Sequence, residues 1–161
     1  MAKKEIRVGI ADMKVARQEG TLITHALGSC IGITIYDPLI KLGALIHIML
    51  PEAGDNKDTN LFKFADTGIK ETLRKLAIFG GVKSRYICKI AGGAQMFAVA
   101  GASNIGNIGQ RNIEAVRKTL RAEGIMIKNQ DVGSNYARTM LMDLETGKVT
   151  LRTAGREEKN L

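Results

Sequence analysis

Two neighbouring apolar stretches near the middle of the chain constrain its fold more than any other feature. Residues Cys30 to Tyr36 are rich in β-branched side chains and end at Asp37-Pro38, and residues Gly43 to Leu50 form a second apolar run that ends at Pro51. β-Branched residues favour strands, and proline ends a strand because it has no amide hydrogen to donate. The connection from Asp37 to Leu42 is short enough for a hairpin. We therefore expect these two runs to pair as neighbouring strands.

Two further stretches have the apolar spacing of amphipathic helices, from about Leu61 to Phe79 and from about Gly109 to Glu123. Thr59 or Asn60 could cap the first of them. The remaining apolar or β-rich stretches predict strands, at Ile6 to Met13, Thr21 to Leu27, Arg85 to Ala91, Ile125 to Val132, Ala137 to Asp143 and Lys148 to Thr153. The polar tail, residues 154–161, is expected to be frayed.

This order of elements predicts a mixed α/β (α+β) fold, a layered sandwich of largely antiparallel strands with two main helices. A doubly wound parallel fold would instead alternate strand and helix throughout. The length of 161 residues fits a single domain over residues 1–161. Because aromatic residues make up only 4% of the chain, the core is expected to consist of Ile, Leu, Val, Ala and Met.

The pattern of apolar and charged residues favours a cytoplasmic protein. No apolar run approaches the roughly 20 residues that span a membrane, and the charged start lacks the apolar region of a secretory signal. Two cysteines are too few for a disulfide framework, so both are expected to be thiols. The spacing of the two cysteines and two histidines does not resemble a zinc site, and we expect no metal.

The charge of the chain favours an acidic partner. Lys and Arg exceed Asp and Glu by 24 to 16, which gives a net charge of +8. Nucleic acid and an acidic protein surface are both candidates. The basic residues are scattered along the chain and few aromatic residues are available for base stacking, so we do not expect nucleic-acid binding.

Cys30 is the first candidate for chemistry. It follows Gly28 and Ser29, small residues that let another part of the backbone approach the thiol, and amides at such a bend can stabilise an oxyanion. A thiol here can act as a nucleophile if a neighbouring group removes its proton. The alternative is a packing role, which is common for free cysteine and is expected for Cys88, in the middle of a strand.

His47 is the one polar side chain in its apolar strand, so it is either a core residue with a satisfied hydrogen bond or a base for Cys30 on the neighbouring strand. A dyad of this kind needs a third group to orient the imidazole, and the hydroxyl of Thr24 is a candidate. His25 is a weaker candidate base, because in a strand its side chain faces away from that of Thr24.

Two glycine-rich stretches, Ala91 to Phe97 and Asn104 to Asn112, lack the residues of a P-loop or a dinucleotide-binding fingerprint. Loops that shape a groove for a protein substrate fit them better. Gly92 and Gly93 would form the first of these loops. Arg111 and Asn112, at the start of the second helix, would donate hydrogen bonds to the carbonyl groups of the glycine-rich loop and so hold it in place.

Five motifs occur in order at suitable spacing: Leu27-Gly-Ser-Cys30, His47-Ile-Met-Leu-Pro51, Lys63-Phe-Ala-Asp-Thr67, Ala91-Gly-Gly-Ala-Gln-Met-Phe97 and Asn107-Ile-Gly-Gln-Arg-Asn112. With these motifs the chain resembles the chemoreceptor glutamine deamidase family, CheD, from about Val8 to Thr153. The chain departs from the family pattern at Asp131 to Ser134, where a double glycine is often found, and the segment from Phe97 to Gly106 is slightly long. Arg138 would likewise hold the glycine-rich loop by hydrogen bonds to its carbonyls, or pair with Asp131.

The resemblance implies a protein-glutamine glutaminase, an amidohydrolase that converts particular glutamines of chemoreceptor cytoplasmic helices to glutamate and releases ammonia. It implies Cys30 as nucleophile, His47 as base and Thr24 as the third catalytic residue, without a metal or organic cofactor. It also implies a fold similar to the catalytic domain of the cytotoxic necrotizing factor deamidases, and binding to CheC, a phosphatase of CheY.

Physical chemistry agrees with the implied reaction. A carboxamide is a poor electrophile with a poor leaving group, and attack by a thiol divides the reaction through a thioester. Two alternatives remain open. The protein could be an adaptor that binds and stimulates a CheC-type phosphatase with little deamidation of its own, or it could be another cysteine hydrolase, such as a small peptidase or a methylesterase.

Overall fold

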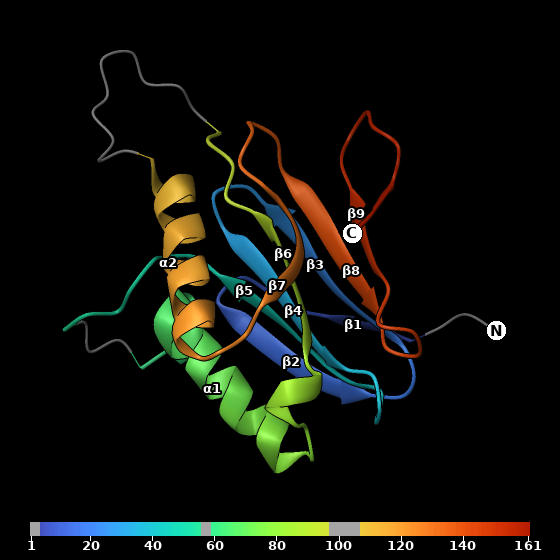
Figure 1. The fold of residues 1–161 in the computed structure, drawn as a ribbon. Coiled ribbons are helices and arrows are strands. Elements are labelled where there is room, and N and C mark those ends of the chain that lie inside the picture. The colour runs from blue at the N-terminus through green and yellow to red at the C-terminus, as the bar shows by residue number, and fades with distance from the viewer. Residues whose placement is uncertain (1–3, 56–58, 97–106) are drawn as a thin grey trace.

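The computed structural model describes residues 4–55, 59–96 and 107–161, and it shows two five-stranded sheets packed face to face with two helices beside them (Figure 1). The outer sheet has the order β1 (Glu5–Arg7), β3 (Thr21–Leu27), β8 (Arg138–Asp143), β9 (Val149–Arg152) and β10 (Lys159–Asn160). The central sheet has the order β2 (Asp12–Arg17), β5 (Leu42–Ile48), β4 (Ile31–Asp37), β6 (Ile87–Gly92) and β7 (Ile127–Val132). The helices α1 (Ala65–Ile78) and α2 (Ile108–Ala122) cover the face of the central sheet that points away from the outer sheet, and η1 (Leu61–Lys63) and η2 (Lys83–Arg85) are short 3-10 helices.

The predicted fold class is confirmed, because only the β1–β3 and β6–β7 pairs are parallel among the described strands. The central sheet separates two hydrophobic cores, one against the helices and one against the outer sheet. None of the helices formed by the described residues is long and apolar enough to span a membrane.

The predicted hairpin is confirmed as β4 and β5, and it lies at the middle of the central sheet with every residue of both strands buried. Alternate side chains point to opposite faces of a strand. Ile46 and Ile48 belong to the core against the helices, whereas Leu45 belongs to the core between the sheets. His47 has the parity of Leu45 and therefore faces the outer sheet.

The first helix begins later than the sequence predicts. Residues Leu61–Lys63 form η1, whose N-cap is Asn60, and Phe64 has an extended backbone before α1 begins at Ala65. Phe64 forms a parallel bridge with Leu50, and the amide of Ala65 donates to the carbonyls of Leu50 and Pro51. This pairing with the end of the hairpin interrupts a pattern that by itself favours a continuous helix.

Two expectations at the chain termini are wrong. The predicted strand from Ile6 to Met13 is two strands, because the chain turns at Ala11, with a φ of 56°, and passes from the outer sheet to the central sheet. The tail is not frayed, because β10 pairs with β9 and the amide of Leu161 donates to Val149. Backbone hydrogen bonds to a free sheet edge hold this segment regardless of its polar side chains.

Candidate active site

Cys30 is the last residue of the bend that joins β3 to β4, and its thiol is half-buried. The bend is irregular because the β3–β8 register shifts between Thr24 and Leu27 and Ala26 has a φ of 58°. The amide of Gly93 donates to the carbonyl of Cys30 at 2.9 Å, and the amide of Ala94 donates to that of Gly28 at 2.8 Å. The loop after β6 therefore holds the backbone on both sides of the thiol.

Gly92 and Gly93 are required for this close approach. Both have positive φ angles, and a Cβ atom on Gly92 would lie 2.2 Å from the carbonyl oxygen of Cys30. A Cβ atom on Gly93 would lie 2.4 Å from the side chain of Ile113 on α2. Only glycine tolerates both the backbone conformation and the contact. The predicted glycine loop thus lies directly against the Cys30 bend.

Asn112 connects the two elements that carry the candidate dyad. It is fully buried on α2, and its Nδ2 donates to the carbonyl of Ser29 at 2.9 Å and to that of Met49 at 2.8 Å. Ser29 precedes Cys30, and Met49 follows His47 by two residues. Asn112 therefore holds the Cys30 bend and not, as expected from the sequence, the carbonyls of the glycine-rich loop, whereas Arg111 is exposed and lines a shallow surface pocket with Glu52 and Lys118.

Arg138 shows both of its expected roles. Its guanidinium is buried, pairs with Asp131 at 2.9 Å, and donates to the carbonyl of Gly92 in the glycine-rich loop at 3.5 Å and to that of Gly133 at 3.0 Å. The amide of Gly133 in turn donates to the carbonyl of Gly92 at 2.9 Å. Arg138 thus supports the glycine loop from the outer sheet. Residues 97–106, the segment expected from the sequence to be slightly long, lie outside the described residues.

The imidazole of His47 and the hydroxyl of Thr24 meet between the two sheets. Thr24 Oγ1 lies 2.6 Å from His47 Nδ1 and 2.8 Å from the carbonyl oxygen of Val8, and both side chains are fully buried. The carbonyl can only accept, so the single hydroxyl proton of Thr24 goes to Val8 and the oxygen accepts a hydrogen bond from Nδ1. The neutral imidazole then carries its proton on Nδ1 and has a free electron pair on Nε2.

His47 Nε2 is a buried atom without a hydrogen-bond partner among the residues that the structure describes. Buried polar groups are nearly always paired, so such an atom suggests a catalytic or ligand-binding role. Burial lowers the pKa of His47 from 6.5 to about 4, which keeps the ring neutral at pH 7. The exposed side chain of His25 lies outside this arrangement.

Cys30 lies on the same side of the central sheet as His47. Gly32 is directly opposite His47 in the β4–β5 register, and Cys30 has the parity of Gly32. The side chain of Cys30 also packs against the core between the sheets, the core that His47 faces. Burial raises the pKa of the Cys30 thiol, so the resting thiol is protonated at neutral pH. Cys88 is fully buried in the other core, and burial raises its pKa to about 12, which agrees with the packing role expected of it.

A thiol, a neutral imidazole and a hydroxyl that orients the imidazole are the groups that a thiol-dependent hydrolase requires. The described residues contain no group of three or more His, Cys, Asp and Glu side chains that could hold a metal ion. The one contributor that sequence reasoning missed is the carbonyl of Val8, a backbone group that no side-chain pattern identifies.

The family model described as "CheD chemotactic sensory transduction" matches residues 49–153. A protein of Syntrophomonas wolfei named "Probable chemoreceptor glutamine deamidase CheD" is 48% identical over 157 residues, which cover 97% of this chain and 98% of the relative. Proteins with the same name from Desulforamulus reducens and Moorella thermoacetica are 48% and 47% identical, over 94% and 97% of this chain and 92% and 95% of their own lengths. The chain belongs to the CheD family.

Proposed function

We propose that this protein is a chemoreceptor glutamine deamidase, which hydrolyses the side-chain amide of glutamine to glutamate and ammonia with Cys30 as its nucleophile. Relatives of that name match nearly the whole chain. The observation that carries the proposal is the imidazole of His47. Its Nε2 has no hydrogen-bond partner among the described residues, Thr24 and Val8 fix the protonation of the ring, and the ring lies on the side of the central sheet where Cys30 packs.

The first half of the reaction forms a thioester. Nε2 of His47 accepts the thiol proton as Sγ of Cys30 attacks the carboxamide carbon, and the carbonyl oxygen becomes an oxyanion. The imidazolium then gives this proton to the leaving nitrogen, the carbon–nitrogen bond breaks and ammonia departs. Because both groups are neutral at rest, the proton moves during attack and no stable thiolate–imidazolium pair is needed.

The second half returns the enzyme to its starting state. His47 takes a proton from water, the resulting hydroxide attacks the thioester, and the proton returns to Sγ as glutamate leaves. The hydroxyl of Thr24 holds Nδ1 throughout, so Nε2 is the nitrogen that exchanges protons. Backbone amides of the bend formed by Gly28, Ser29 and Cys30 are our candidates for stabilising the oxyanion.

The remaining predicted residues shape the site in this proposal. Gly92 and Gly93 hold the bend from one side, and Asn112 holds it from the other. Arg111, which is exposed on α2, would contact the substrate. The substrate would be the cytoplasmic helices of chemoreceptors, so the enzyme would act in the cytoplasm and without a metal or organic cofactor. Binding of a CheC phosphatase is a separate proposal that co-purification of the two proteins tests.

The decisive experiment incubates the protein with a chemoreceptor cytoplasmic fragment and measures Gln-to-Glu conversion by mass spectrometry. We expect conversion by wild type and by Cys88→Ala, the matched thiol control, and none by Cys30→Ala. Thr24→Ser should retain more activity than Thr24→Val, because serine keeps the hydroxyl. Equal conversion by wild type and Cys30→Ala would refute the assignment of the nucleophile, and cleavage of the backbone would indicate a peptidase.

A further inference from the structure

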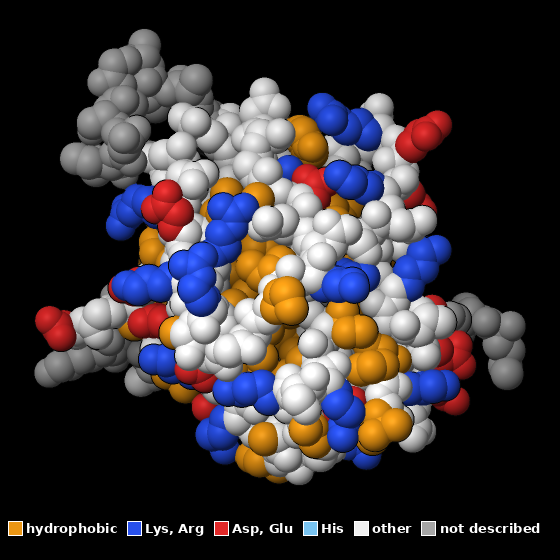
Figure 2. Space-filling model, viewed as in Figure 1, with side chains coloured by type: hydrophobic (Ala, Val, Ile, Leu, Met, Phe, Trp, Pro, Cys, Tyr) orange, Lys and Arg blue, Asp and Glu red, His pale blue; other side chains and the backbone are white. Residues whose placement is uncertain are grey.

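A shallow groove lies on the surface between α2 and β7. It is lined by Arg117 and Arg121 from the helix, by residues 124–127 of the following turn, and by Gln130 from β7. Ile125 is buried beneath it, whereas Met126 is 83% exposed, the largest exposed fraction of any large hydrophobic side chain among the described residues. Figure 2 shows hydrophobic side chains recessed beside Lys and Arg side chains that gather over α2. The groove thus combines an apolar floor with a basic wall.

The basic character of this wall comes from the solvent-facing side of α2. That side carries four basic residues and one acidic residue between positions 111 and 121, namely Arg111, Glu114, Arg117, Lys118 and Arg121. Arg117 donates to the neutral amide oxygen of Gln130 at 2.9 and 3.1 Å, a contact that orders the guanidinium without neutralising it. Arg117 and Arg121 are four residues apart and therefore project from one side of the helix.

The groove is connected to the active site through α2 itself. Asn112, near the start of the helix, donates to the carbonyl of Ser29 beside Cys30. Arg121 lies nine residues further along, which corresponds to about 13 Å at the rise of an α-helix. A helix bound along the solvent-facing side of α2 would run from the groove towards the N-terminal end of α2, the end where Asn112 contacts the Cys30 bend.

We propose that the groove between α2 and β7 is the docking surface for an acidic amphipathic helix of the substrate protein, whose glutamine side chain is presented to Cys30. This inference rests on the proposed function. The exposed side chain of Met126, with Ile125 and Ile127 beside it, takes the apolar stripe of such a helix, and methionine adapts to partners of different shape. Arg117 and Arg121 pair with carboxylates spaced one turn apart on the substrate, since guanidinium binds carboxylate in a bidentate manner. Each turnover adds a further carboxylate to the substrate, which strengthens the charge complementarity.

The test is the full-length double variant Arg117→Glu/Arg121→Glu with a chemoreceptor cytoplasmic fragment as the probe. We expect KM to rise about tenfold at low salt and kcat to change less than about twofold, because the change affects encounter and docking and leaves Cys30 and His47 in place. The difference in KM from wild type should narrow as salt is added. The matched control is Lys41→Glu/Lys148→Glu, which changes net charge equally at two exposed positions on the β4–β5 and β8–β9 turns. Its KM should stay within about twofold of wild type.

Three outcomes overturn the docking surface: an unchanged KM, a fall in kcat at constant KM, or an equal rise in KM for the control. If the first variant folds poorly, Arg117→Gln/Arg121→Gln replaces it, because this variant removes charge without reversing it. Its KM should lie between those of wild type and the charge reversal. Alkylation of Cys30 by iodoacetamide at the wild-type rate shows that the site is intact. Absence of conversion by wild type would overturn the proposed function instead. In that case, calorimetry measures the affinity of the fragment for Cys30→Ala with and without the Arg117→Glu/Arg121→Glu changes. Equal affinities would overturn the docking surface.

Discussion

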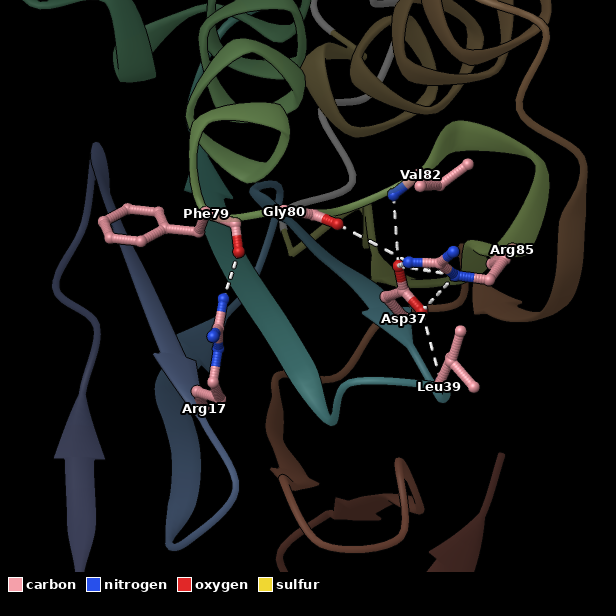
Figure 3. A network of polar contacts seen from close by, with 7 residues as sticks. All are labelled: Arg17, Asp37, Leu39, Phe79, Gly80, Val82 and Arg85. Atoms are coloured by element: carbon pink, nitrogen blue, oxygen red, sulfur yellow. Dashed lines mark hydrogen bonds and ion pairs between the residues drawn. The ribbon is translucent and has the colours of Figure 1, made fainter.

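The two ends of the β4–β5 hairpin both bury polar side chains, but they treat them in opposite ways. At the turn end, the carboxylate of Asp37 is fully buried and accepts hydrogen bonds from Arg85, at 2.7 Å for the shortest, and from the amides of Val82 and Leu39 (Figure 3). At the other end, His47 Nε2 and Asn112 Oδ1 are buried and have no partner among the described residues. A satisfied buried group stabilises the fold, whereas an unsatisfied one is retained for a reaction or a ligand.

The turn end is built as a structural joint. The Asp37–Arg85 pair ties the β4–β5 turn to η2, and Arg17 donates to the carbonyl of Phe79 after α1 (Figure 3). Burial alone would raise the pKa of Asp37, but the hydrogen bonds from Arg85, Val82 and Leu39 hold it below its usual value of 3.8. The charge of Asp37 is therefore stabilised in place. The ring of His47 is instead neutral, and its Nε2 carries the electron pair that accepts a proton in the proposed reaction.

Among the changes that test this contrast between the two ends of the hairpin, His47→Gln has the largest expected effect. We expect kcat for deamidation to fall about a thousandfold, because the variant loses its general base. The melting temperature should fall by only about a few degrees, because the variant loses the hydrogen bond between Nδ1 and Thr24 but also removes a buried nitrogen that has no partner among the described residues. Thermal unfolding and steady-state kinetics on one preparation measure both quantities.

The pH profile of wild type checks the same assignment. With the pKa of His47 lowered to about 4, the acid limb of kcat/KM should lie near pH 4 and not near 6.5. The lowered pKa of His47 also predicts how the stability of the fold depends on pH. The unfolded chain binds the proton at higher pH than the folded one, so stability falls as pH drops from 6.5 towards 4. An acid limb near pH 6.5 would show that the ring is not held neutral.

Asp37→Asn should have the opposite effect at the other end of the hairpin. We expect the free energy of unfolding to fall by about 2 kcal/mol, less than the 3–5 kcal/mol of a fully buried pair, because the Arg85 side chain is 30% exposed and water screens the charge. The kcat of the folded fraction should stay within about twofold of wild type. A large loss of kcat would mean that the two ends are coupled and that the turn end is part of the catalytic apparatus.

Urea unfolding at two pH values sharpens this second prediction. The folded-state pKa of Asp37 is lowered, so its contribution is present above the usual carboxyl pKa and is lost as pH falls through the folded value. The difference in stability between wild type and Asp37→Asn should therefore be largest at neutral pH and shrink in acid. A difference that does not depend on pH would assign the loss to packing and not to charge.

The sequence predicts the hairpin well and singles out His47, because both depend on local patterns. The β-branched run into Asp37-Pro38 specifies a strand and its end, and a lone histidine in an apolar strand stands out without a structure. The break at Phe64 could not be found in this way. Its extended backbone depends on a bridge to Leu50, and periodicity records which face is buried but not which strand lies against it.

The same limit applies to the candidate site. The carbonyl of Val8 fixes the proton of Thr24 only because the chain passes from one sheet to the other between β1 and β2, and the alternation of Ile6, Val8 and Ile10 indicates a single strand instead. The sequence predicts that Asn112 lies near the start of a helix, but its two carbonyl partners come from residues 83 and 63 positions away in the chain. Contacts of that range follow from topology, which the order of elements alone does not define.

Asn112 shares features of both ends of the hairpin, because its Nδ2 donates two hydrogen bonds whereas its buried Oδ1 has no partner among the described residues. We expect Asn112→Ala to lower kcat about tenfold with little change in KM, since the bend that carries Cys30 loses its attachment to α2 and small displacements of a nucleophile are costly. The matched control is Asn107→Ala, which removes the N-cap of the same helix, a side chain that accepts from Gln110. The control should lower stability by about 1 kcal/mol without slowing alkylation of Cys30. If both variants reduce kcat only in proportion to the unfolded fraction, Asn112 stabilises the helix and does not position the thiol.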